Sequence, residues 1–234
     1  MGVMCGRYGF IPEDNFYDRF EIQNRLERLE THYNVVPGMM MPVITRNSPK
    51  KVENMKWGLI PFWAKDPKIG YKMINARAEG ISQKPAFKKP IRSQRCLIPT
   101  SGFFEWKRLD QEKIPYYIRL KDKKTFVFAG LYDVWVNAEG YSLKSFTIIT
   151  TVPNKLVVSI HDRMPVILDD GFAEIWLDNR ITDINILLDL LKPFEEDKME
   201  SFPVSKLINN PANDNSEVIK PIKIEKTSQS SFLL

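Results

Sequence analysis

The chain has 234 residues and a formal net charge of +5. Its length indicates one or two domains, and a hydrophobic content of 43% suffices for a substantial core. No run of 18 apolar residues and no signal peptide occurs, so we expect no membrane-spanning segment. Two cysteines and two histidines are too few for a disulfide framework, a cysteine-based zinc site or a His-rich metal site. We therefore expect a cytoplasmic protein without a metal or other cofactor, and a monomer is the default.

The first third of the chain predicts helices and then a pair of strands. Apolar spacing favours one or two helices between residues 12 and 29. Residues 41–45 and 54–60 are expected to pair as strands around a turn at Asn47-Ser48-Pro49. An aromatic-rich loop over residues 57–63 then closes the second strand.

The remainder predicts more strands, followed by helices. A basic segment interrupted by Pro85 and Pro90 is expected to be a loop or a short helix. β-Branched and aromatic residues between turn signals predict strands at 95–98, 116–120, 125–134 and 145–150. Helices are expected at 171–177 and from Thr182 to just before Pro193.

The irregular alternation of these elements, without an internal repeat or a Gly/Ser linker, predicts an α+β fold. We expect a single domain over residues 4–223, with a curved, mainly antiparallel and barrel-like β-sheet flanked by helices. Residues 1–3 are expected to be an N-terminal extension, and residues 224–234 a disordered tail with little apolar content.

Basic residues are unevenly distributed and allow two interpretations. One group falls in a single segment and another lies beside the candidate site residues: Lys84, Lys88, Lys89, Arg92 and Arg95 in the first, Arg7, Arg77 and Arg163 in the second. Such clusters are either a solvated face or a surface for nucleic acid.

Cys5 follows Met4 and would become the terminal residue if Met4 were the true start and were removed. It would then carry a free α-amine and a thiol, which together convert an aldehyde first to an imine and then to a five-membered thiazolidine. An α-amine of pKa about 7.7–8.0 is roughly one-tenth unprotonated at pH 7, far more than a lysine of pKa about 10.4. Cys5 is therefore a candidate aldehyde trap, although a near-terminal cysteine can also be incidental.

Three further residues are candidates for chemistry. Asn75 either forms a turn or orients an oxygen by hydrogen bonding. Glu105 lies among aromatic residues, where burial would raise its pKa and suit it to proton transfer, unless it points outward from a half-buried strand. His161 is either a capping or packing residue or a catalyst.

Five segments in order resemble the SOS response-associated peptidase (SRAP) family, over residues 4 to about 221. They are Met4-Cys-Gly-Arg-Tyr8, Trp57-Gly-Leu-Ile-Pro61, Asn75-Ala-Arg-Ala-Glu79, Gly102-Phe-Phe-Glu-Trp106 and Ile160-His-Asp-Arg-Met-Pro165. Val204-Ser205 and Asn209-Asn210-Pro211 match the family's C-terminal pattern as well. The resemblance implies the SRAP fold and a protein that binds abasic sites in single-stranded DNA, located with the nucleoid when bound.

The resemblance also implies roles for individual residues. Cys5 would form the thiazolidine with the opened sugar and shield the lesion, Asn75 would hold the sugar or the terminal amine, Glu105 would be the general acid/base, and His161 would promote opening of the sugar. Phosphates would be held by arginines and the pocket lined by a threonine: Arg7, Arg77, Arg163 and Thr150. Trp57, Trp63 and Trp106 would either stack on bases or pack in the core.

One departure from the family pattern concerns the N-terminus. Met1-Gly2-Val3-Met4 precede Cys5, and while they remain attached the cysteine nitrogen is an amide that cannot form an imine. Either Met4 is the natural start, or the protein clips itself, as the peptidase in the family name suggests. The abasic-site function leaves lyase-like chemistry on DNA open as well. Two other functions stay open: a cysteine peptidase using Cys5 and His161, and a non-catalytic nucleic-acid-binding module.

Overall fold

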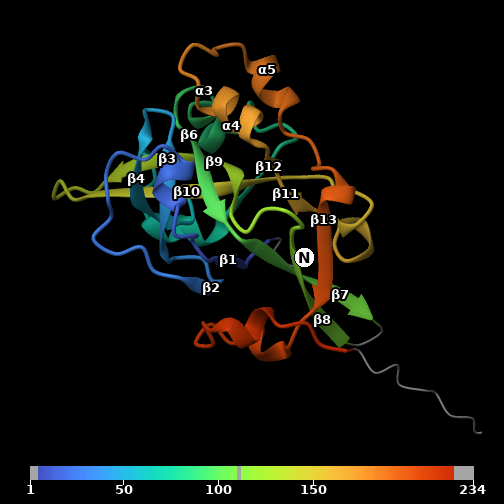
Figure 1. Ribbon diagram of the computed structural model, residues 1–234. Helices are drawn as coiled ribbons and strands as arrows, with labels where there is room; N and C mark the ends of the chain where they lie inside the picture. Colours follow the sequence, from blue (N-terminus) through green and yellow to red (C-terminus); the bar gives the residue numbers. More distant parts are fainter. Residues whose placement is uncertain (1–4, 110–111, 224–234) are drawn as a thin grey trace, which may run out of the picture.

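A closed β-barrel and a second, open β-sheet organise the chain in the computed structural model, which describes residues 5–109 and 112–223 (Figure 1). The barrel strands are β3 (Met40–Thr45), β4 (Ser48–Trp57), β6 (Arg95–Thr100), β9 (Phe126–Val136) and β10 (Ser142–Thr151). Their pairings run β3–β4–β10–β9–β6 and back to β3, so the ring closes. Every pairing in the ring is antiparallel except β4 with β10, which is parallel.

Short strands extend the barrel at the end that carries the candidate residues. β5 (Asn75–Arg77) continues the parallel pairing along β10, with Asn75 opposite Ile148 and Arg77 opposite Thr150. Two further short strands, β11 (Met164–Pro165) and β12 (Ile167–Leu168), pair with β10 and β9.

The second sheet is antiparallel and has the order β13-β8-β7-β1-β2. Its strands are β1 (Tyr8–Phe10), β2 (His32–Val35), β7 (Gly102–Leu109), β8 (Glu112–Leu120) and β13 (Met199–Pro203). The chain passes from β6 in the barrel to β7 in this sheet within two residues. Gly102 permits the step, because a Cβ there would lie 2.3 Å from the ring of Tyr117, well inside van der Waals contact.

Helices are few and short. They are α1 (Phe16–Arg19), α2 (Pro85–Lys88), α3 (Pro90–Ser93), α4 (Asp170–Leu177) and α5 (Ile184–Asp189), with 3₁₀ turns η1 (Pro67–Lys72), η2 (Val157–Ser159), η3 (Glu196–Lys198), η4 (Lys206–Asn209) and η5 (Ser216–Ile219). Asp169 caps α4 by accepting a hydrogen bond from the Phe172 N–H, and Asp183 caps α5 in the same way. Helices α4 and α5 lie against one side of the barrel, and the C-terminal turns lie on the far side of the second sheet (Figure 1).

Strand alternation divides the core into an inner and an outer cluster. Ile98 and Phe128 point to the cluster that fills the barrel, whereas their neighbours Leu97 and Val127 point outward to the cluster that includes Trp176 of α4. A third, smaller cluster packs the C-terminal turns on the second sheet, against Phe104 and Tyr117.

The α+β class and the mainly antiparallel, barrel-like sheet are confirmed. The pairing of β3 with β4 and the helices α4 and α5 also follow the expectation, whereas the one or two helices expected between residues 12 and 29 are reduced to one short helix. Only Phe16–Arg19 is helical there, because Glu21 adopts a left-handed φ of +50° and the chain then bonds to Lys50 through the Gln23 N–H. The expected extension at residues 1–3 and the tail at 224–234 lie outside the described residues. Within the described part of the chain, no helix has the length and apolar character needed to cross a membrane.

Candidate active site

Cys5 and Glu105 meet where β1 and β7 run side by side. Cys5 lies three residues before β1, and its backbone N–H donates a hydrogen bond of 2.8 Å to Oε1 of Glu105. The β1–β7 pairing, with Tyr8 opposite Phe103, brings the two residues together although they are one hundred positions apart in sequence. A left-handed φ of +37° at Cys5 is part of this geometry, and it is a costly conformation for a residue with a Cβ.

Both partners are buried, and burial governs their ionisation. Cys5 is 1% exposed and Glu105 is 2% exposed. Loss of solvation raises the pKa of Glu105 to about 8, although the hydrogen bond from the Cys5 N–H opposes that shift. Burial, and then the charge of Glu105, raise the pKa of the Cys5 thiol well above its usual range. Near neutral pH the pair therefore consists of a carboxylic acid and a thiol, both protonated.

His161 stands on the other side of the Glu105 carboxyl group. Its Nε2 lies 3.8 Å from Oε2 of Glu105, an ion-pair distance that is longer than a hydrogen bond. The Arg163 N–H donates to Nδ1 of His161 at 3.2 Å, which assigns the ring proton to Nε2 and aims it at Glu105. Asp162 Oδ1 also lies 3.1 Å from Nδ1, but its side chain is 86% exposed and the backbone donor is the more fixed partner. Glu105 thus lies between the Cys5 nitrogen and an imidazole.

Asn75 completes the group from the barrel side. It begins β5, and its Nδ2 donates to the Cys5 carbonyl oxygen at 3.5 Å. The sequence-predicted residues Cys5, Asn75, Glu105 and His161 therefore converge from four separate segments. Of the two alternatives for Glu105, burial is the one that the structure shows, since β7 turns this side chain to the buried face, like Phe103.

Arg163 and Thr150 form a second, largely buried group next to His161. The Arg163 guanidinium makes two parallel hydrogen bonds to Glu79, of 2.7 and 2.8 Å, and a third of 2.7 Å to the Thr150 carbonyl. The hydrogen bond with Arg163 lowers the pKa of Glu79, and the charge of Arg77 contributes to the same shift. A phosphate reaching Arg163 would have to displace Glu79. Thr150 itself is fully buried and does not line an open pocket as expected, because its place in β10 covers the side chain.

The remaining predicted residues differ in exposure. Arg77 is exposed on β5. Arg7 donates to the Asn34 side chain and the Asn209 carbonyl, and the half-buried Trp106 donates its indole N–H to the Asn209 side chain at 2.9 Å.

The sequence model of the family described as SOS response associated peptidase (SRAP) matches residues 4–211. The chain belongs to the SRAP family. Among curated proteins, the abasic site processing protein YoqW of Bacillus subtilis is 49% identical over 222 residues, covering 93% of this chain and 99% of YoqW. The abasic site processing protein HMCES of Xenopus tropicalis is 32% identical and covers 84% of this chain and 68% of that protein. A crystal structure of a protein from Bacteroides thetaiotaomicron superimposes with a TM-score of 0.86 at 32% identity, covering 94% of this chain and all of that one.

Two of the three tryptophans expected at an SRAP site are accessible for stacking, and one is not. Trp63 is 48% exposed and Trp106 is partly exposed. Trp57 is 1% exposed, donates its indole N–H to the Ile74 carbonyl at 2.9 Å and lies parallel to the ring of Phe146. Of the two alternatives for Trp57, stacking on bases or packing in the core, the structure shows core packing, because the ring is part of the barrel core.

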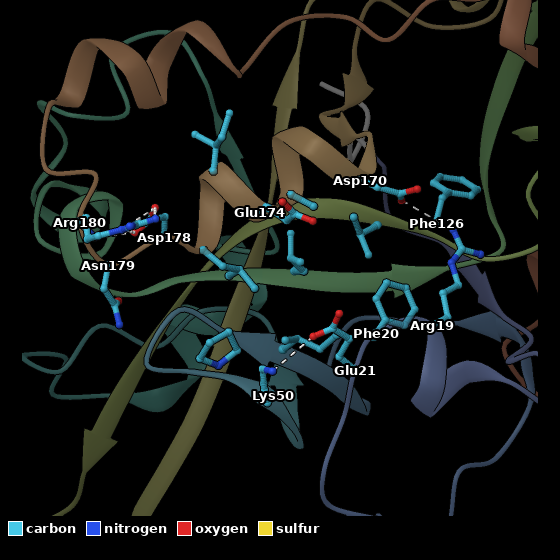
Figure 2. A pocket seen from close by; sticks show the side chains of 17 residues that line it. Arg19, Phe20, Glu21, Lys50, Phe126, Asp170, Glu174, Asp178, Asn179 and Arg180 are labelled. Carbon is cyan, nitrogen blue, oxygen red and sulfur yellow. Dashed lines mark hydrogen bonds and ion pairs between the residues drawn. The ribbon is translucent and has the colours of Figure 1, made fainter.

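A groove of about 930 Å³ lies on another part of this SRAP chain, between α4 and the β3–β4 hairpin (Figure 2). Its floor is apolar and its rim carries paired charges, including Lys50 with Glu21 and Arg180 with Asp178 (Figure 2). None of the predicted site residues lines it. Among the described residues no cluster of three or more His, Cys, Asp or Glu side chains could hold a metal ion.

Sequence reasoning missed Glu79 and Asn34, which contact the SRAP site residues Arg163 and Arg7, and Asp214, which contacts Asn34. Glu79 is the last residue of the segment Asn75-Ala-Arg-Ala-Glu79 that resembles the family, and its negative charge could have indicated that it pairs with Arg163. Asn34 and Asp214 gave no such signal, because each acts on a segment about 180 residues away in sequence.

Proposed function

We propose that this chain binds abasic sites in single-stranded DNA and captures the ring-opened sugar as a thiazolidine on Cys5. The observation that carries the proposal is the 2.8 Å hydrogen bond between the Cys5 nitrogen and the buried carboxyl group of Glu105. This hydrogen bond places the Glu105 carboxyl group, which can donate or accept a proton, at the Cys5 nitrogen, which must become the imine nitrogen. The names of the curated relatives support the choice of substrate.

The chemistry requires the Cys5 nitrogen to be a free amine, so the chain would begin at Cys5. Cleavage of the preceding peptide bond, or a start at Met4 followed by its removal, would provide that amine. It would also remove the backbone torsion that is left-handed at Cys5, since φ is defined by the preceding carbonyl carbon. The SRAP domain expected over residues 4–223 would then act without Met4, as residues 5–223.

Glu105 can serve both proton transfers of the reaction. The Cys5 amine adds to the sugar aldehyde, and protonated Glu105 gives its proton to the hydroxyl that leaves as water. The thiol then adds to the carbon of the C=N bond, and the thiol proton passes to Glu105. The reaction as a whole releases one water and regenerates protonated Glu105. While the Cys5 nitrogen is an amide, the pKa of Glu105 is about 8, in the range where a carboxyl group can both give and accept a proton near neutral pH.

The residues around Cys5 and Glu105 support these reaction steps. His161, with its Nε2 proton aimed at Glu105, would exchange protons between that carboxyl group and the sugar oxygen as the ring opens. Asn75 would orient the Cys5 end of the chain, while Arg7, Arg77 and, after release of Glu79, Arg163 would hold phosphates. Trp63 and Trp106 would stack on flanking bases, worth roughly 1–3 kcal/mol each.

The buried, protonated thiol favours an aldehyde trap over a peptidase that acts on other proteins. Peptide hydrolysis by cysteine uses a thiolate with a lowered pKa at an accessible position. Burial instead raises the pKa of the Cys5 thiol. An intramolecular attack on its own preceding peptide bond would need no access for a foreign substrate.

The test is to mix protein that begins at Cys5 with single-stranded DNA containing one abasic site, and to separate the products on a denaturing gel. We expect a heat-stable adduct that Cys5→Ser abolishes and that Cys96→Ser, a change at a buried cysteine in β6, leaves intact. DNA carrying a tetrahydrofuran analogue, which has no aldehyde, should form none. A heat-stable adduct with Cys5→Ser, or with protein whose intact mass still includes residues 1–4, would refute the proposal.

A further inference from the structure

Arg7 has an environment suited to an external anion. Its side chain is partly buried, which lowers its pKa, and its hydrogen bonds go to two neutral oxygens, Asn34 Oδ1 at 3.1 Å and the Asn209 carbonyl at 3.5 Å. Within the described residues no carboxylate lies at ion-pair distance from its guanidinium. Arg163, by contrast, is neutralised by Glu79. Arg7 therefore keeps its full charge for a phosphate, which a guanidinium binds through its forked donors.

Asn34 links Arg7 to the C-terminal turns. It lies in β2 and is 1% exposed, and while its side-chain oxygen accepts from Arg7, its Nδ2 donates to three backbone carbonyls. The three acceptors are the carbonyls of Ile208 at 3.3 Å, Asn210 at 3.1 Å and Asn213 at 3.0 Å. One buried amide group thus fixes both the guanidinium and the turn formed by residues 208–213.

Asp214 secures the same turn from the other direction. Its Oδ1 accepts hydrogen bonds from the backbone N–H groups of Tyr33 and Asn34, at 2.5 and 2.9 Å, and its Oδ2 lies 2.7 Å from Nδ1 of His32. The family model ends at residue 211, before Asp214. In the fold, the C-terminal turns pack beside β2 and β8 (Figure 1). The segment after the matched region is therefore tied to the strand that holds Arg7 in place.

We propose that Asn34 is a positioning residue for DNA binding: together with Asp214 it fixes the turn of residues 208–213 on β2 and presents the guanidinium of Arg7 to a backbone phosphate of the abasic strand. The inference rests on the proposed function in one respect, namely that the anion is a DNA phosphate. Trp106 belongs to the same unit, because its indole N–H is held by the Asn209 side chain. Loss of the Asn34 amide would remove three of the hydrogen bonds that hold the turn and one of the two that orient the guanidinium.

The experiment measures binding of the full chain to a single-stranded oligonucleotide with a tetrahydrofuran site, by fluorescence anisotropy over a range of salt concentrations. Each phosphate contact contributes about 0.7 to the slope of log K against log salt for single strands. We expect Asn34→Ala and Arg7→Ala each to lower the slope by about that amount, and the double variant to lower it no further. Asn24→Ala is the matched control, because Asn24 also bonds a backbone N–H and a carbonyl, both of Val52, away from Arg7; its slope should equal that of the parent.

An unchanged slope in folded Asn34→Ala, or a further loss in the double variant, would overturn the inference. If Asn34→Ala does not fold, the isosteric Asn34→Asp takes its place, since it sets a carboxylate against Arg7 and should lower the slope by the same amount; an unchanged slope there would equally overturn it. The adduct assay separates the two proposals. A parent that forms no adduct while the slopes change as expected refutes the thiazolidine chemistry alone, whereas normal adduct with unchanged slopes refutes the role of Asn34 alone.

Discussion

A single carboxyl group, Glu105, connects the backbone of Cys5 to the imidazole of His161. If it transfers the protons of the proposed reaction, Glu105→Gln should slow adduct formation by roughly 10²- to 10⁴-fold, because the amide can neither give nor accept a proton at these steps. The measurement is the single-turnover rate at saturating abasic DNA. Affinity for tetrahydrofuran-containing DNA should change little. A Glu105→Gln protein that reacts at the parental rate would exclude Glu105 as the acid/base.

Substitution of Arg77, which lies on the short strand β5 beside the barrel, tests the proposed phosphate contacts. It is exposed on β5, two residues after Asn75. Arg77→Ala should weaken non-covalent binding and lower the slope of log K against log salt by about 0.7, without changing the adduct rate at saturation. Equal affinity for parent and variant at every salt concentration would remove Arg77 from the binding surface.

At this scale, residue chemistry was predictable and residue environment was not. The aminothiol at Cys5 and the possible acid at Glu105 follow from residue type and neighbours in sequence. The burial of Trp57 and Thr150 does not follow from the sequence, because a residue of either type can face solvent or the barrel interior in the same local sequence. To predict Glu79 as the partner of Arg163, one would have to know that β5 and β11 both pair with the same strand, β10.

Among the elements, the segment between β4 and β5 depends on a close approach of two glycines. Gly58 has a φ of +118°, and a Cβ there would lie 2.7 Å from the Gly70 carbonyl oxygen. This contact holds the segment that ends at Asn75. Gly58→Ala should therefore destabilise the protein by roughly 3 kcal/mol or more, since it combines an unfavourable φ with a backbone clash.

Chemical denaturation measures this loss. Gly140→Ala is the control, because Gly140 has a φ of +84° but no heavy atom within 4 Å of its would-be Cβ; it should cost only the conformational term, about 1–2 kcal/mol. Equal losses in the two variants would mean that the Gly58–Gly70 approach contributes nothing.

Elements with strong local signals were predicted well, and those held by distant partners were not. β9 and β10 are long and rich in β-branched and aromatic residues, and α4 has an Asp cap. β1 and β5 have three residues each and exist because β7 and β10 supply their hydrogen bonds. The sequence window of such a strand contains too little information to identify it.

For the whole molecule, the buried Glu105 makes stability depend on pH. Its pKa is about 8 in the folded protein against 4.5 for the free side chain, so the folded state binds more protons between these values. Stability from this group is fully present below about pH 4.5 and is lost as the pH rises through 8. In protein that retains residues 1–4, so that the Cys5 nitrogen is an amide, the unfolding free energy should therefore fall between pH 6 and pH 9, by roughly 2–4 kcal/mol relative to Glu105→Gln.

Urea denaturation at several pH values gives this difference directly. Glu174→Gln, at an exposed position on α4, should follow the parent at every pH. A constant difference in unfolding free energy between parent and Glu105→Gln across this range would show that the carboxyl group titrates normally in the folded state.

Closure of the barrel by β4 and β10 also determines when a growing polypeptide can become native. Lys56 pairs with Ser145, so a nascent chain leaving the ribosome carries β3, β4 and β6 with open edges until β10 has been synthesised. Unpaired edges are templates for association with other chains. Premature termination before residue 142 should thus yield insoluble fragments rather than a smaller folded protein. The site at Cys5, although its first residue is made early, can form only after His161 has been synthesised.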